Sequence, residues 1–163
     1  MDKKFWDGKF SLKLVDKEGK TLWEEVKHNS LSQQGEANFL DTYFRGLHTP
    51  TEFYLRLCND TLDVGDTLTT IIGEPSGFGY TPMLIERSAV GWPTLEINEG
   101  AYRLVSKTIT ITAVGGDIGP VNTSFISTTI DNSGSLVAFV TFDVPRTILD
   151  GSSLIATYQA SLQ

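Results

Sequence analysis

Cysteine, histidine and proline are scarce in this chain, with one, two and six copies among 163 residues. The single cysteine, Cys58, cannot form an internal disulfide. Together with His28 and His48 it supplies too few soft ligands for a zinc site built from Cys and His. A low proline content beside 15 glycines also excludes collagen-like and Pro-rich low-complexity chains. The sequence therefore predicts a globular protein without a metal or a cofactor.

Basic residues and long apolar runs are also in short supply. The 13 Lys and Arg residues stand against 20 Asp and Glu, so the formal net charge is −7. This charge repels phosphate backbones and anionic lipid surfaces, which predicts no nucleic-acid and no membrane partner. Thr and Ser interrupt every apolar stretch before it reaches membrane-spanning length. Residues 1–6 meet Asp7 and Gly8 before a signal-peptide core can form, so we expect synthesis in a cytoplasm.

Hydrophobic residues make up 40% of the chain, which is enough for one well-buried core. We expect a single β-rich domain over residues 1–163, in which residues 1–8 form an extended arm. The arm carries two aromatic side chains, Phe5 and Trp6, that either dock on a partner or cover the edge of the chain's own core.

Period-2 alternation dominates the pattern of apolar residues. Residues 9–28 predict a β-hairpin, because two alternating segments flank the turn residues of 16–20. After Pro50, extended segments recur about every ten residues, which predicts a β-sandwich or jelly-roll. The expected strands are 53–58, a short strand around Ile85, 94–97, 102–105, 108–112, 121–126, 136–142 and 154–162. In 108–112 two isoleucines alternate with three threonines, which indicates a sheet with one wet face.

One segment, 33–45, predicts an α-helix. Ser32 is a suitable N-cap, and Gly46 stands where a left-handed residue would end the helix. Ala37, Leu40 and Phe44 follow at helical spacing, although Gly35 costs the helix about 1 kcal/mol relative to alanine.

The segment 59–81 has no sustained period and predicts a long ordered loop. Asp60, Asp63 and Asp66 recur in it every three residues, which is not the spacing of an EF-hand, so solvated carboxylates are favoured over a calcium site. Residues 73–80 are glycine-rich but lack the Gly-Lys-Ser/Thr of a phosphate loop, and we expect a tight turn that packs Tyr80.

Catalytic patterns are weak. No serine stands in a Gly-x-Ser-x-Gly elbow, and the alternation around Cys58 predicts that its thiol is buried rather than activated by His48. Glu86 and Glu96 are the nearest carboxylate pair for a glycan hydrolase. We therefore expect no enzyme.

Tyr80 and Trp92 are the candidate residues for a weak contact with a sugar ligand. An aromatic face beside carboxylates suits a sugar ring, whereas Trp92 after Gly91 fits a turn anchored by a buried indole equally well.

A series of short motifs in fixed order resembles small structural proteins encoded in the virion gene modules of tailed bacteriophages, over about residues 28–163. The motifs are His28-Asn29-Ser30-Leu31, Gly35-Glu36, Leu40-Asp41-Thr42-Tyr43-Phe44-Arg45-Gly46, Pro50, Phe53-Tyr54-Leu55-Arg56-Leu57, Asp66-Thr67-Leu68, Gly73-Glu74-Pro75-Ser76-Gly77, Gly79-Tyr80, Glu86-Arg87-Ser88 and Gly91-Trp92-Pro93. Members are regarded as capsid decoration (cement) proteins or as tail- and fibre-associated proteins, and no catalytic residues come with the resemblance.

The resemblance implies a non-catalytic virion protein, made in the host cytoplasm. The leading expectation is a decoration protein on the outer face of the major capsid protein. The alternative is a tail, collar or fibre-associated protein, with a host-glycan contact near Tyr80 and Trp92. For assembly we expect a homo-oligomer, with a trimer favoured, and an interface built from the N-terminal aromatic residues. The expected interface residues are Phe5, Trp6, Phe10 and Trp23.

Overall fold

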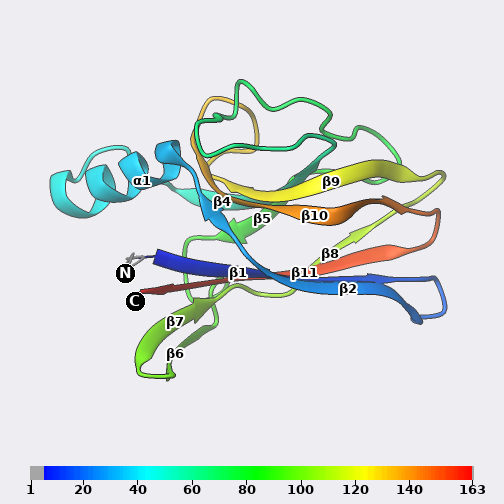
Figure 1. Cartoon of the computed structure of the whole chain (residues 1–163), viewed down its shortest axis with the longest axis horizontal. Helices are drawn as coiled ribbons and strands as arrows, with labels where there is room; N and C mark the ends of the chain where they lie inside the picture. The colour runs from blue at the N-terminus through cyan, green and yellow to red at the C-terminus, as the bar shows by residue number, and fades with distance from the viewer. Residues whose placement is uncertain (1–5, 163) are drawn as a thin grey trace.

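The computed structural model describes residues 6–162 and shows two antiparallel β-sheets packed face to face (Figure 1). The first sheet has the order β2-β1-β11-β7-β6, and β8 also pairs with β11; its strands are β1 (Trp6–Val15), β2 (Thr21–His28), β6 (Thr94–Asn98), β7 (Ala101–Val105), β8 (Ile109–Thr112) and β11 (Ser153–Leu162). The second sheet has the order β3-β10-β9-β4-β5; its strands are β3 (Ser30–Leu31), β4 (Glu52–Cys58), β5 (Met83–Glu86), β9 (Ile118–Ser127) and β10 (Leu136–Ile148). The predicted mainly β, sandwich-like fold class is confirmed.

The main core lies between the two sheets and follows the alternation of the sequence. On β8, Ile109 and Ile111 are buried while Thr110 is exposed, as the period predicts. On β1, Phe10 is fully buried between the sheets and contacts the ring of Tyr158 at 4.8 Å between centroids. The expectation that Phe10 belongs to an interface is therefore wrong, because its side chain faces the core between the two sheets.

The expected arm, residues 1–8, is part of the sheet wherever the structure describes it. Trp6, Asp7 and Gly8 pair with Leu162, Ser161 and Ala160 of β11. The prediction of an arm is therefore wrong for these three residues, since β11, at the other end of the chain, pairs with them. Residues 1–5, and with them the predicted interface residue Phe5, lie outside the described residues.

The predicted helix is α1 (Gln33–Leu40), which continues as one π-helical turn, η1 (Asp41–Arg45). Ser32 caps it as predicted: its hydroxyl oxygen accepts from the Gly35 amide at 2.8 Å and donates to the Leu136 carbonyl at 2.5 Å. Gly46 ends the helix with a φ of 64°. The helix is too short and too polar to cross a membrane, as is every other helical segment within residues 6–162.

Gly35 explains how α1 meets the sandwich. A Cβ on Gly35 would lie 2.2 Å from the carbonyl oxygen of Val137 on β10. The helix therefore touches the second sheet through its first turn and projects beyond it (Figure 1).

The long loop, residues 59–82, connects β4 to β5 and covers the outer face of the second sheet (Figure 1). Leu62 and Leu68 of this loop are buried with Cys58 in a second, smaller core. The other buried members of that core are Phe125, Leu136 and Phe139. The loop is ordered because it carries its own apolar anchors.

Candidate functional site

An apolar groove opens between the sheets at the end of the sandwich where β1 begins and β11 ends. It is a cavity of about 680 Å³, within the size range of small-molecule pockets. Its walls include Trp6 and Tyr158 from the first sheet and Phe53 from the second. Trp92 and Arg87, from the connection between β5 and β6, complete the walls on one side.

Aromatic contacts hold the walls of this groove in place. The Trp92 ring packs edge-on against Phe53 at 5.8 Å and against Tyr158 at 6.2 Å between centroids. The Trp6 indole N–H donates to the Tyr158 hydroxyl at 3.2 Å. Complete burial raises the pKa of Tyr158, so its hydroxyl stays neutral. The groove is therefore a preformed apolar surface.

One cation stands at the rim of the groove. Arg87 is exposed, and its guanidinium donates to the Pro50 carbonyl at 3.1 Å. This bond ties Arg87 to the segment just before β4 and uses one of the five N–H donors of a guanidinium.

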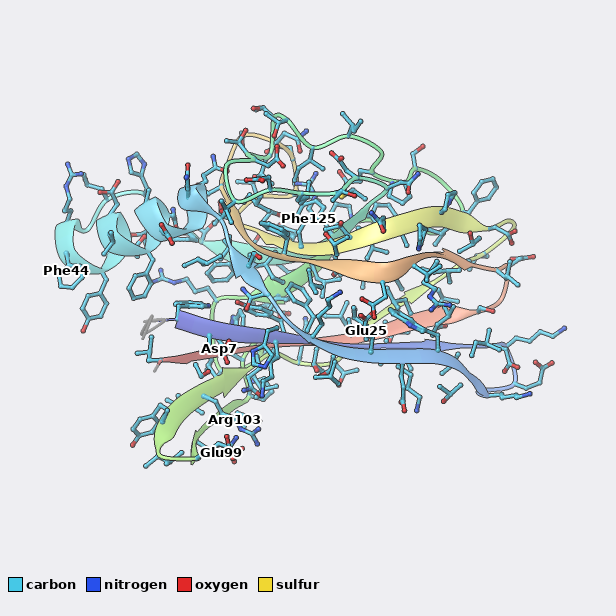
Figure 2. The ribbon with its side chains drawn as sticks, viewed as in Figure 1. Asp7, Glu25, Phe44, Glu99, Arg103 and Phe125 are labelled. Carbon is cyan, nitrogen blue, oxygen red and sulfur yellow. The ribbon has the colours of Figure 1, made fainter. Side chains whose placement is uncertain are left out.

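Beside the groove, the helical segment carries an exposed apolar tip, which we call the knob: Leu40, Tyr43, Phe44 and Leu47. Tyr43 and Phe44 are 74% and 71% exposed, and Figure 2 shows Phe44 at the far end of the helix, away from both sheets. Phe39 stacks on Tyr43 at 6.0 Å and meets Trp6 edge-on at 5.4 Å. Through Phe39 and Trp6 the knob is continuous with the groove.

The exposure of the knob could not be predicted from the spacing of its apolar residues. Leu40 and Phe44 fall at the spacing of a core-facing helix, yet they are 53% and 71% exposed. The helix packs through Gly35 instead, so its apolar stripe faces solvent. Exposed aromatic residues on a projecting helix are typical of an interaction surface.

The β6–β7 hairpin flanks the groove on its other side and also presents apolar side chains. Leu95, Ile97 and Tyr102 are each more than half exposed. One pair of neighbouring charges is neutralised within the hairpin, because the guanidinium of Arg103 binds the carboxylate of Glu96. Figure 2 shows Arg103 on this hairpin, which projects away from the sandwich on the side of the first sheet.

Two of the predicted interface residues remain to be placed. Trp6 is half-buried and lines the groove, so it lies at the apolar end. Trp23 is half-buried on β2, where it packs on Phe142 at 5.3 Å and under the guanidinium of Arg146 at 4.8 Å. Trp23 therefore closes the seam between the sheets, away from the groove.

The structure does not bring the predicted ligand residues Tyr80 and Trp92 together in the groove. Trp92 lines it, whereas Tyr80 serves the long loop. The Tyr80 hydroxyl accepts from the Leu57 amide and donates to the Glu74 carboxylate, both at 2.9 Å. Burial raises the pKa of Tyr80, and the glycine-rich turn packs it against the core as predicted.

The carboxylates considered for catalysis are held by separate cations. Glu86 on β5 lies 2.6 Å from Lys107, and that bond lowers the pKa of Glu86. Glu96 is bound by Arg103 in the other sheet. Burial raises the pKa of the Cys58 thiol to about 12, as expected for a cysteine that packs as a small hydrophobe.

The aspartates of the long loop accept hydrogen bonds from their own loop. Asp66 accepts from the Asp63 amide at 2.7 Å, and Asp60 from the Ile72 amide at 3.2 Å. Within residues 6–162, no three His, Cys, Asp or Glu side chains are grouped as metal ligands.

No protein-family model matches the chain, and no curated protein matches it in sequence.

Proposed function

We propose that the chain is a non-catalytic structural protein of a tailed-phage virion, and that it decorates the outer face of the major capsid protein. The observation that carries this proposal is the apolar end of the sandwich. There the knob, the groove and the β6–β7 hairpin expose large hydrophobic side chains in one region. Contiguous apolar surface of this extent on a folded domain is typical of a protein–protein interface.

The rest of the molecule supports a role in assembly rather than in catalysis. Its single cysteine, Cys58, is buried with a raised pKa. Glu86 and Glu96 are each engaged by a cation of their own. The surface available to a partner is the apolar end, whose shape and exposed apolar area suit a protein contact.

Decoration also requires many equivalent contacts on a repeating shell. Strands β2 and β6 end the strand order of the first sheet, β8 pairs with β11 alone among the described strands, and an edge strand can pair with a neighbouring chain. A homo-trimer, the favoured oligomer, would sit on a symmetry axis and add weak contacts into avidity.

A tail, collar or fibre-associated role is the second candidate. The observation in its favour is Trp92, whose ring forms part of an open groove of ligand size. An aromatic ring in such a groove suits a host glycan.

The number of copies per particle tests the proposal. The chain would be quantified by mass spectrometry in purified particles of the phage that encodes it, with the major capsid protein as the internal standard. We expect a ratio close to one decoration protein for each capsid subunit or for each symmetry axis. A handful of copies per particle would favour the tail or collar, and absence from the particle would contradict both candidates.

A further inference from the structure

We infer that the apolar end is a self-association surface, in which the knob of one copy of this chain enters the groove of a second copy. The inference rests on the proposed structural role, since it names the contact through which copies would assemble. It concerns the purified chain alone, so its test is separate from the count of copies in a virion.

The first argument is the area of exposed apolar surface. Seven large hydrophobic side chains of this end are between 43% and 74% exposed. They are Leu40, Tyr43, Phe44 and Leu47 of the knob and Leu95, Ile97 and Tyr102 of the β6–β7 hairpin. At roughly 190 Å² for a whole large side chain, they leave on the order of 800 Å² to solvent. When a twofold axis buries the knob and the groove side of each copy together, that area matches one side of a standard stable interface, roughly 800 Å² per partner.

The second argument is complementary shape on the same chain. The knob is convex and ends in two adjacent rings, Tyr43 and Phe44, with centroids 5.0 Å apart. The groove is concave, with about 680 Å³ of space between aromatic walls. A pair of rings fits within a cavity of this size, which is that of pockets for drug-sized molecules. A second copy brings a knob for each groove, so both surfaces are satisfied by one kind of partner.

The third argument is charge. The net charge of −7 opposes self-association in general. At this end, however, two ion pairs reduce that repulsion: Arg45 binds Asp41 at 2.7 Å on the knob, and Arg103 binds Glu96 on the hairpin. Arg87 adds a cation at the rim of the groove. The knob is the C-terminal end of a helix, which carries partial negative charge, so it complements Arg87.

The geometry allows two symmetries. Because the knob and the groove adjoin at one end of the chain, a twofold axis can place each knob in the other copy's groove and close a dimer, whereas a rotation that places one knob per contact continues into a ring. The mass of the oligomer distinguishes the dimer from the ring.

The test is the mass of the purified full chain by size-exclusion chromatography with light scattering. We expect a discrete oligomer, a multiple of 17.9 kDa. Phe44→Ser on the knob and Ala89→Arg at the groove should each weaken self-association by about 30-fold or more, the effect of losing a central interface anchor. Both sites are exposed, so the far-ultraviolet circular dichroism, which reports the secondary structure, should match that of the parent chain.

A matched control is Ile72→Ser, since Ile72 is 68% exposed but lies on the long loop. This variant should keep the parent mass. A monomeric parent chain would overturn the inference. So would an oligomer that neither Phe44→Ser nor Ala89→Arg weakens, because its interface would lie elsewhere.

Cross-linking distinguishes knob-to-groove contact from knob-to-knob contact. An Arg45→Cys chain, which keeps the apolar side chains of the knob, is mixed with an Ala89→Cys chain and oxidised, so that two thiols on different copies lose their protons and two electrons to the added oxidant and form one disulfide. The buried Cys58 should not compete. We expect the mixed pair to cross-link far faster than Arg45→Cys alone, and equal rates would overturn the proposed arrangement.

Discussion

Arg56 and Glu74 form a bidentate pair across the long loop, with guanidinium-to-carboxylate distances of 2.9 Å and 2.5 Å. Arg56 is 3% exposed in the middle of an apolar strand, and its guanidinium lies 5.2 Å from the centre of the Phe125 ring. It also donates to the Asp131 carbonyl and to the side chain of Asn132. One buried cation thus fastens two loops to the outer face of the second sheet, where Figure 2 places Phe125.

Removing the partner of this cation should be costly. Glu74→Ala leaves Arg56 buried without its counter-ion, and we expect a loss of about 3 kcal/mol in the free energy of unfolding, at the lower end for broken buried pairs. The measurement is urea denaturation followed by tryptophan fluorescence. Glu18→Ala is the control, since Glu18 forms an exposed pair at 3.9 Å with Lys17 and should change stability by less than about 0.5 kcal/mol. Equal losses in the two variants would show that the Arg56 pair is not a structural anchor.

The sequence predicts the local elements of the fold well and the long-range ones poorly. The hairpin over 9–28 and the helix over 33–45 are recovered because turn residues, the Ser32 cap and Gly46 act within a few residues. The error over residues 6–8, predicted as an arm, has the opposite origin. Whether β1 is an edge or an inner strand depends on β11, which lies about 150 residues away along the chain.

The candidate site depends on the same long-range information. Trp6 and Tyr158 meet in the groove although they are 152 residues apart. Periodicity correctly gives the apolar stripe of Leu40 and Phe44, but it cannot show whether anything covers that stripe. The signal that was available is Gly35, because a glycine in the first turn of a helix indicates close backbone approach at that turn, away from the stripe.

Gly35→Ala should therefore destabilise the protein, even though alanine is the better helix former by about 1 kcal/mol. The new methyl group would collide with the Val137 carbonyl at 2.2 Å, and overpacking of this kind costs about 1–3 kcal/mol. We expect a lower melting temperature by circular dichroism. Gln33→Ala, an exposed change in the same turn, should leave the melting temperature nearly unchanged. A higher melting temperature in both variants would mean that the first turn of α1 does not pack against β10.

Glu25 predicts a pH dependence of stability. Burial, reinforced by the nearby Asp143, raises the pKa of Glu25 despite the attraction of Lys27. The native state therefore binds this proton more tightly than the unfolded chain does, so stability from Glu25 is full below the ordinary glutamate pKa and falls as pH rises through the raised value.

It follows that Glu25→Gln should stabilise the protein at neutral pH, by roughly 1 kcal/mol, since one Glu25 carboxylate oxygen is buried without a partner. The gain should vanish below about pH 4, where Glu25 is protonated in both states. Urea denaturation across this pH range measures it, and Glu24→Gln, an exposed change on the same strand, is the control. A stabilisation that does not depend on pH would contradict the assigned cause.

Cys58 should be inert toward thiol reagents while the protein is folded. Its side chain is fully buried in the second core, and burial raises its pKa to about 12, so almost no thiolate exists at pH 8. Reaction with an aromatic disulfide reagent should then require opening of the long loop or global unfolding, and its rate should rise by orders of magnitude in denaturing urea. Glu74→Ala removes the partner of Arg56 that holds this loop. When Glu74→Ala and Gly35→Ala are compared at urea concentrations that give them equal free energies of unfolding, Cys58 should react faster in Glu74→Ala. Labelling of the native chain as fast as of the unfolded chain would mean that the loop does not cover Cys58 in solution.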